Sequence, residues 1–322
     1  MFRSRLIPVW TRLAQMACLG VLCAVSGVQA ARAQGSGADG RLPVVASFSI
    51  LADIAREVGG DDIRLDVLVG PMRDAHTFEP TPKDARVLTQ AQVLIVNGLG
   101  FESWMPRLVE AAGFKGRTIT ASQGVQPRHL DAEAGDTHDH AGHDHGGIDP
   151  HAWQNLANGV IYARNIAQGL ADADPAHASA YRARAEAYVR TLEQADADWR
   201  RQLDAIPADR RVMATSHDAF GYFSDAYGIH VLSVVGLSSE AEPSARTMAD
   251  LATRIRAHHI RALFLEQGGN TRALEQIAAE TGVQPGGTLY ADTLEAPGHD
   301  VSTYLGMFRW NTRHLLQAFQ SP

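Results

Sequence analysis

Apolar residues follow two alternating spacings in the first part of the chain. Short strand-like segments, some of them continuous apolar runs typical of strands buried in a parallel sheet, alternate with segments that have the spacing of amphipathic helices. The predicted strands are residues 42–48, 63–69, 93–96 and 117–121. The predicted helices are residues 50–58, 81–90 and 101–112. Strand–helix alternation of this kind indicates a mostly parallel sheet with helices on both faces.

The same alternation returns near the end of the chain. Its predicted strands are residues 211–215, 230–234 and 260–265, with a strand end at 288–290. Its predicted helices are residues 219–227, 244–258, 271–281 and 301–319. The chain therefore repeats one architecture twice without obvious sequence identity. In such sheets, ligands bind at the carboxyl ends of the strands.

Two helices are predicted between the repeats, at residues 154–171 and 176–206. The second is rich in Ala, Arg and Glu, lacks glycine and ends at Pro207, so we expect a rigid connector. The predicted fold class is α/β, with two lobes joined by one long rigid helix. The predicted organisation is a signal peptide at 1–33, a disordered segment at 34–41, an N-terminal lobe at 42–173, a linking helix at 174–207 and a C-terminal lobe at 208–322.

The N-terminus has the features of a secretory signal. Arg3, Arg5 and Arg12 precede an apolar run at residues 13–28, and small residues follow. Cleavage after Ala30 or Ala33 fits the small-residue rule for signal peptides. The alternative is a transmembrane anchor, for which the run is short. We expect a cleaved signal and export to the periplasm.

The positions of the cysteines and the net charge indicate which kinds of metal site and partner the mature protein can have. Cys18 and Cys23 both lie within the predicted signal, and the residues before them match a lipid-attachment box poorly, so we expect no lipidation. The mature chain then has no cysteine, which excludes disulfides and thiolate metal sites. Cleavage removes four arginines and no acid, and the net charge of -7 becomes -7 - 4 = -11. An acidic exported protein suits cations and disfavours nucleic acids.

A histidine-rich segment interrupts the first alternation within a loop predicted at 129–147. It holds four histidines in eight residues, interleaved with Asp and Gly: His138, His140, His143 and His145. Gly and Asp cannot build a packed face, so we expect a surface loop. The four imidazoles could bind zinc weakly and raise its local concentration. The alternative is a disordered linker that happens to be rich in histidine.

Three further histidines share a different setting, at loop ends bracketed by aromatic residues or proline. His76 follows a predicted strand, His151 precedes a helix after Pro150, and His217 lies between a strand and a helix. Asp292 also follows a strand. Three imidazoles and one carboxylate form a suitable tetrahedral set for zinc. With two ligands from each half, the metal would lie between the lobes, although spacing alone does not force these residues together.

The motifs around these residues resemble one protein family over the whole mature chain. They are residues 74–80, 96–102, 149–153, 216–223, 239–244, 264–266 and 289–292. In order and content they are similar to the periplasmic solute-binding proteins of zinc and manganese ABC importers, the ZnuA/TroA-like cluster A-I, and within it to AztC-like zinc-binding proteins. The resemblance implies a fold that flexes little on binding, with His76, His151, His217 and Asp292 as metal ligands.

Two departures from the family pattern bear on the metal. Some zinc members place a carboxylate directly before the first histidine, where this chain has Ala75, so Asp292 is the better fourth ligand. Manganese members usually have Glu as the third ligand, and imidazole at His217 favours zinc. Glu266 is expected to orient a ligand, or alternatively to be a polar residue that serves packing.

The expected function is a high-affinity zinc receptor that delivers Zn²⁺ to a membrane ABC permease. The resemblance to AztC-like proteins implies a periplasmic zinc metallochaperone as donor, and we expect a monomer. One alternative is a manganese receptor of the same family. Another is a zinc-dependent hydrolase, which needs an open coordination position, and the chain has no H-E-x-x-H motif.

Overall fold

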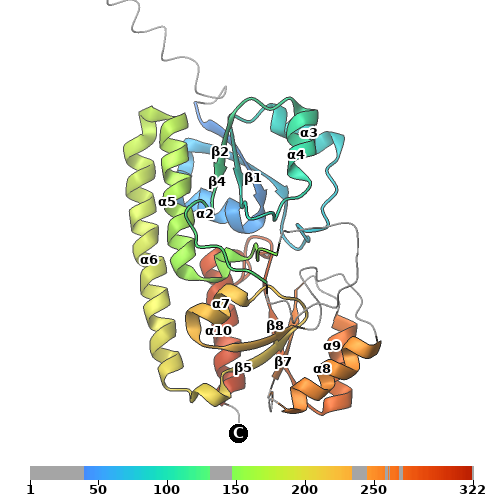
Figure 1. Ribbon diagram of the computed structural model, residues 1–322. Coiled ribbons are helices and arrows are strands. Elements are labelled where there is room, and N and C mark those ends of the chain that lie inside the picture. Colours follow the sequence, from blue (N-terminus) through green and yellow to red (C-terminus); the bar gives the residue numbers. More distant parts are fainter. Residues whose placement is uncertain are drawn as a thin grey trace, which may run out of the picture.

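The computed structural model describes residues 40–130, 147–233, 245–257, 260, 262–267 and 271–320. The predicted signal peptide and the four histidines of the His-rich segment lie outside these residues. Within the described part of the chain, no helix has both the length and the apolar character required to cross a lipid bilayer. Figure 1 shows two α/β lobes stacked one above the other, with two long helices along one side.

The N-terminal lobe is built on a four-stranded parallel sheet in the order β2-β1-β3-β4. The strands are β1 (Leu42–Phe48), β2 (Ile63–Val69), β3 (Val93–Val96) and β4 (Arg117–Thr120). The helices between them are α2 (Ser49–Gly59), α3 (Pro82–Thr89) and α4 (Met105–Ala112). All seven residues of β1 are buried, as expected for a central strand covered on both faces.

The C-terminal lobe repeats this topology with the order β6-β5-β7-β8, again parallel. Its strands are β5 (Val212–Thr215), β6 (His230–Ser233), β7 (Ala262–Glu266) and β8 (Gln284–Leu289). Its helices are α7 (Gly221–Tyr227), α8 (Ala245–Ala257), α9 (Thr271–Thr281) and α10 (Tyr304–Gln320). The predicted pair of parallel-sheet lobes is therefore confirmed.

Helices α5 (Leu156–Ala173) and α6 (Ala178–Asp204) pack together on one side of the molecule. Helix α6 runs past both lobes before the chain enters β5, which confirms the long connecting helix (Figure 1). Its buried side chains recur at helical spacing: Tyr181, Ala185, Tyr188, Val189, Leu192, Trp199 and Leu203. Because one continuous helix contacts both lobes, it limits how far they can move apart.

Helix α4 begins later than the apolar pattern suggests, at Met105 rather than at Phe101. The preceding turn is held by the buried carboxylate of Glu102, which accepts hydrogen bonds from the Asn97 backbone N–H (2.7 Å) and the Ser47 hydroxyl (2.6 Å). Leu99, in the same turn, has a φ of 54°. A turn satisfied by its own internal carboxylate does not continue as helix.

The lobes share one hydrophobic core at their junction. It includes Phe48 and Trp153 from the first half and Phe223 and Phe308 from the second. A smaller separate core, which includes Leu251 of α8, lies within the C-terminal lobe. The shared core indicates that the two lobes pack as one unit at the junction.

Hydrogen bonds across the junction fix how the lobes meet. The Met72 backbone N–H donates to the Leu294 carbonyl (3.0 Å), and the Leu294 N–H donates to the Ser49 hydroxyl (3.1 Å). Nearby, the Tyr304 N–H donates to the Asp53 carboxylate (2.8 Å). These bonds tie the loop before His76 to the segment just after Asp292.

Asp53 predicts a pH effect on stability. Burial is the main cause that raises its pKa to about 6, although the hydrogen bond from Tyr304 opposes the rise. Since the unfolded pKa is lower, this carboxyl group contributes most stability below about pH 4, and the contribution is lost as pH rises through about 6. The free energy of unfolding of Asp53→Asn, compared with that of the unaltered protein at the same pH, should therefore be about 2–3 kcal/mol higher at pH 7 than at pH 4. Urea unfolding at both pH values measures this, with exposed Asp66→Asn as the control; an equal difference at both pH values would refute it.

Candidate metal centre

Four loops bring the predicted ligands to one place at the lobe junction. His76 lies between β2 and α3, His151 directly before the short turn that leads into α5, His217 after β5 and Asp292 after β8. Three of these positions follow the carboxyl end of a parallel strand, the usual ligand-binding edge of such sheets. One ligand atom from each residue lies within 4.8 Å of the other three, so the structure brings all four predicted residues together.

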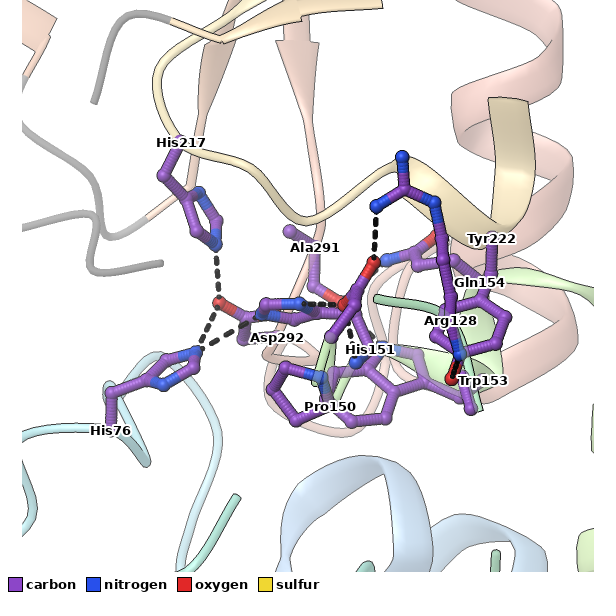
Figure 2. Close-up of polar contacts among 12 residues, drawn as sticks. His76, Arg128, Pro150, His151, Trp153, Gln154, His217, Tyr222, Ala291 and Asp292 are labelled. Atoms are coloured by element: carbon purple, nitrogen blue, oxygen red, sulfur yellow. Dashed lines mark hydrogen bonds and ion pairs between the residues drawn. The ribbon is translucent and has the colours of Figure 1, made fainter. Parts of the chain in front are cut away.

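The ligand atoms face a common centre (Figure 2). The Nε2 atoms of His76 and His151 are 3.2 Å apart. The Asp292 carboxylate lies 2.9 Å from Nε2 of His217, 3.5 Å from Nε2 of His76 and 3.6 Å from Nε2 of His151. Three imidazole nitrogens and one carboxylate oxygen thus converge from different directions, as a four-coordinate divalent metal requires.

The centre is buried, with His151 and His217 almost inaccessible and His76 and Asp292 only 7% and 8% exposed. The Phe101 ring packs edge-on against His76, with centroids 4.7 Å apart. Trp153 lies against His151 at 5.3 Å. These aromatic side chains hold the imidazole planes and exclude water around them.

Burial and neighbouring charges shift the pKa values of two of the ligands, His217 and Asp292. Burial by itself lowers the pKa of His217, but the negative charges of Glu266 and Asp292 outweigh it and raise that pKa well above its usual range. For Asp292, burial favours a higher pKa, but the adjacent His217 and His151 charges hold it well below the usual range. Binding a divalent cation therefore replaces a proton on His217.

Glu266, at the end of β7, holds His217. Its Oε1 accepts hydrogen bonds from the His217 backbone N–H (2.9 Å) and the Ser216 hydroxyl (2.8 Å), and its Oε2 pairs with Nδ1 of His217. With Nδ1 paired to this carboxylate, Nε2 is the nitrogen that gives up its proton and binds the metal. These contacts support the orienting role predicted for Glu266 over a packing role.

Glu266→Gln should weaken metal binding by about 10–100-fold, because the neutral amide no longer fixes and polarises the His217 ring. Calorimetric titration of the purified variant measures the loss. Glu275→Gln, at an exposed position in α9, is the matched control and should leave affinity unchanged. An unchanged affinity in Glu266→Gln would show that this carboxylate serves packing alone.

Asp149 supports His151 in the same way, and sequence reasoning did not assign it a role. Its fully buried Oδ1 accepts the His151 backbone N–H (2.9 Å) and lies 2.8 Å from Nδ1 of the same ring. The sequence contains one sign of this role, because Asp149 lies two residues before His151 with Pro150 between them. At that spacing a carboxylate can turn back and contact the imidazole.

The loops that carry the ligands are held by indole and amide groups. Trp104 Nε1 donates to the Ala75 carbonyl (2.9 Å), next to His76. Asn97 Nδ2 donates to the Pro150 carbonyl (2.9 Å), next to His151. Across the junction, Trp153 Nε1 (2.9 Å) and Gln154 Nε2 (2.8 Å) both donate to the Ala291 carbonyl, next to Asp292. These hydrogen bonds thus fix the loops on which the ligands lie.

The comparisons with known proteins agree with this geometry. Residues 44–318 match the ZnuA family, described as zinc-uptake complex component A, periplasmic. The metal ABC transporter substrate-binding lipoprotein FimA of Streptococcus parasanguinis is 30% identical over 306 residues, which cover 93% of this chain and 96% of FimA. The manganese ABC transporter substrate-binding lipoprotein PsaA of Streptococcus pneumoniae is 30% identical over 283 residues, covering 86% of this chain and 88% of PsaA.

Solved structures show the same fold. The periplasmic zinc binding protein TroA from Treponema pallidum superposes with a TM-score of 0.77 and 28% identity, covering 88% of this chain and all of TroA. Family membership excludes the zinc hydrolase alternative, because these relatives are transport receptors. The chain belongs to the ZnuA family of solute-binding proteins, and it is an extracytoplasmic metal-binding receptor that works with the membrane permease of an ABC importer.

Proposed function

We propose that the cargo is Zn²⁺, captured at the four-ligand centre and delivered to the importer's permease. The donor set carries this proposal: three imidazole nitrogens and one carboxylate oxygen, all within 4.8 Å of one another. Imidazole is a good zinc ligand, whereas manganese favours sites dominated by oxygen. For a common donor set, divalent zinc also binds more tightly than manganese.

Names of relatives do not choose the metal, since TroA is described as zinc binding and PsaA as a manganese protein. The direct test loads the metal-free mature protein with equimolar Zn²⁺ and Mn²⁺ and measures bound metal after gel filtration. We expect one zinc per chain and little manganese. Equal or greater occupancy by manganese would support the manganese receptor instead.

The proposal extends to the route of export. Residues 1–33 form a cleavable signal peptide, and both cysteines leave with it. The mature protein is then an unlipidated periplasmic monomer. Intact mass spectrometry of the periplasmic protein should show a chain that begins after Ala30 or Ala33 and carries no lipid. A lipid-modified cysteine at the N-terminus would overturn this part.

The histidine-rich segment is proposed to collect zinc for the buried centre and to receive it from a periplasmic metallochaperone, as the resemblance to AztC-like proteins implies. Deletion of residues 136–147 should leave the tight site nearly intact, because all four of its ligands lie outside this segment. The same deletion should remove weak additional zinc sites and slow transfer from the donor. If calorimetry shows that the deletion removes the tight site, the histidine-rich segment is part of that site and the proposal is wrong.

A further inference from the structure

An ion pair between a buried carboxylate and a partly buried guanidinium lies directly behind the metal ligand His151. Oδ1 of Asp149 holds the His151 ring, while Oδ2 lies 3.5 Å from Nη1 of Arg128. The Asp149 side chain is completely buried and that of Arg128 is 16% exposed. Figure 2 shows Arg128 on the side of His151 away from His76 and His217. The four groups therefore lie in sequence: metal position, imidazole, carboxylate, guanidinium.

Arg128 also links the two halves of the molecule. Its backbone N–H donates to the Tyr222 hydroxyl (2.8 Å), and its Nε donates to the Asp225 carboxylate (3.1 Å), both on α7. Its carbonyl accepts the Asp149 N–H (2.9 Å). These contacts fix the guanidinium beside Asp149.

Helix α7 leaves no space between itself and this ion pair. A Cβ added at Gly221, the first residue of α7, would lie 2.5 Å from Oδ2 of Asp149 and 2.6 Å from the Arg128 guanidinium. The absence of a side chain there lets the helix close over the pair. The charges therefore interact in a packed, weakly screened environment, where Coulomb energies are larger than in water.

The sign of the interaction follows from the charges. The negative charge of Asp149 strengthens His151 as a donor to a cation. The positive charge of Arg128 attracts the same carboxylate and repels a divalent cation bound on the far side of the imidazole. Arg128 thus opposes metal retention, while Asp149 favours it.

We propose that Arg128 is a positioning residue that weakens the hold of His151 on the metal and so speeds release to the permease. A receptor that must hand over its cargo benefits from a ligand whose donor strength is restrained. The inference rests on the proposed metal-receptor function but holds for Zn²⁺ or Mn²⁺ as cargo. Arg128 and Asp149 form one ion pair but are expected to have opposite effects on metal retention.

The test measures the rate of Zn²⁺ release from the mature protein to excess chelator. Arg128→Met retains the aliphatic stem and removes the charge, and it should slow release by on the order of tenfold. Arg128→Lys retains a positive charge but not the forked donors, and should recover part of the release rate that Arg128→Met loses. Arg182→Met removes a positive charge at an exposed position of α6, outside this network, and should stay within about twofold of the unaltered protein.

A merely structural role for Arg128 predicts the opposite result, because a loosened junction would release metal faster. Faster or unchanged release in Arg128→Met, with the metal-free variant folded by circular dichroism, would overturn the inference. If Arg128→Met does not fold, Arg128→Gln removes the same charge while keeping a polar side chain at this position. If the unaltered protein itself retains no metal, the proposed function fails first, and the two failures are distinguished.

Discussion

His151→Ala is expected to abolish tight metal binding while the metal-free protein remains folded. The binding free energy of a structural zinc site is about 10–16 kcal/mol for four ligands. One ligand therefore accounts for about 3 kcal/mol, and its loss weakens the affinity roughly a hundredfold. The loss should exceed this value because His151 has the most buried ring of the set and the Asp149 charge behind it. Isothermal titration calorimetry with Zn²⁺ measures the change.

The matched control is His299→Ala, since the His299 side chain is 62% exposed and lies outside the centre. It should bind zinc like the unaltered protein. Circular dichroism of both metal-free variants separates loss of a ligand from loss of folding. Unchanged tight binding in His151→Ala would contradict the assignment of the centre.

Trp153→Ala should lower the free energy of unfolding by about 3–5 kcal/mol, the usual cost of removing a buried Trp side chain. The ring is fully buried and packs against Phe48 (5.1 Å) and Phe101 (4.9 Å). Its Nε1 also donates to the Ala291 carbonyl across the junction. We therefore expect both a loss of stability and weaker metal binding, because one of the two side-chain hydrogen bonds to the Ala291 carbonyl, next to Asp292, is lost.

Trp153→Phe separates the two contributions. It retains aromatic packing and removes the indole hydrogen bond, while Gln154 still donates to Ala291. Its loss of stability should be about 1–2 kcal/mol, since one hydrogen bond and part of the ring volume are removed. Urea unfolding followed by circular dichroism measures both variants. If Trp153→Ala costs less than about 1 kcal/mol, the shared core does not join the lobes as described.

The fold could be predicted from the sequence largely because strands buried on both faces produce continuous apolar runs. β1 and β2 were predicted to the residue, since the mostly apolar Leu42–Phe48 lies directly before a helical pattern and Ile63–Val69 ends at Gly70-Pro71. β8 was recognised only at its end, because Gln284–Leu289 contains Pro285 and two glycines that hide the strand pattern. The late start of α4 depended on Glu102, whose role is visible only when Ser47 lies beside it.

The metal ligands could be predicted for a different reason. Each lies in a short motif at a loop end, and the resemblance to a family connected motifs far apart in sequence. The residues that orient the rings were harder to predict, because their partners become neighbours only in three dimensions. Glu266 is 49 residues from His217, and Arg128 lies beside Asp149 because its carbonyl accepts the Asp149 backbone N–H and α7 packs over the pair.

Hydrogen bonds from neighbouring side chains hold the loops of the centre. The four ligand atoms lie within 4.8 Å of one another, and side-chain hydrogen bonds hold the Ala75, Pro150 and Ala291 carbonyls beside three of the ligands. Preorganised ligands lose little conformational entropy when the metal arrives. This arrangement favours binding with little rearrangement of the ligand loops.

Anomalous diffraction at the zinc edge from crystals of the zinc-loaded mature protein locates the bound metal. We expect one strong peak per chain, at about 2.0–2.2 Å from Nε2 of the three histidines and from a carboxylate oxygen of Asp292. The ligands are His76, His151, His217 and Asp292. A principal peak bound elsewhere, or one that lacks any of these four residues, would contradict this assignment.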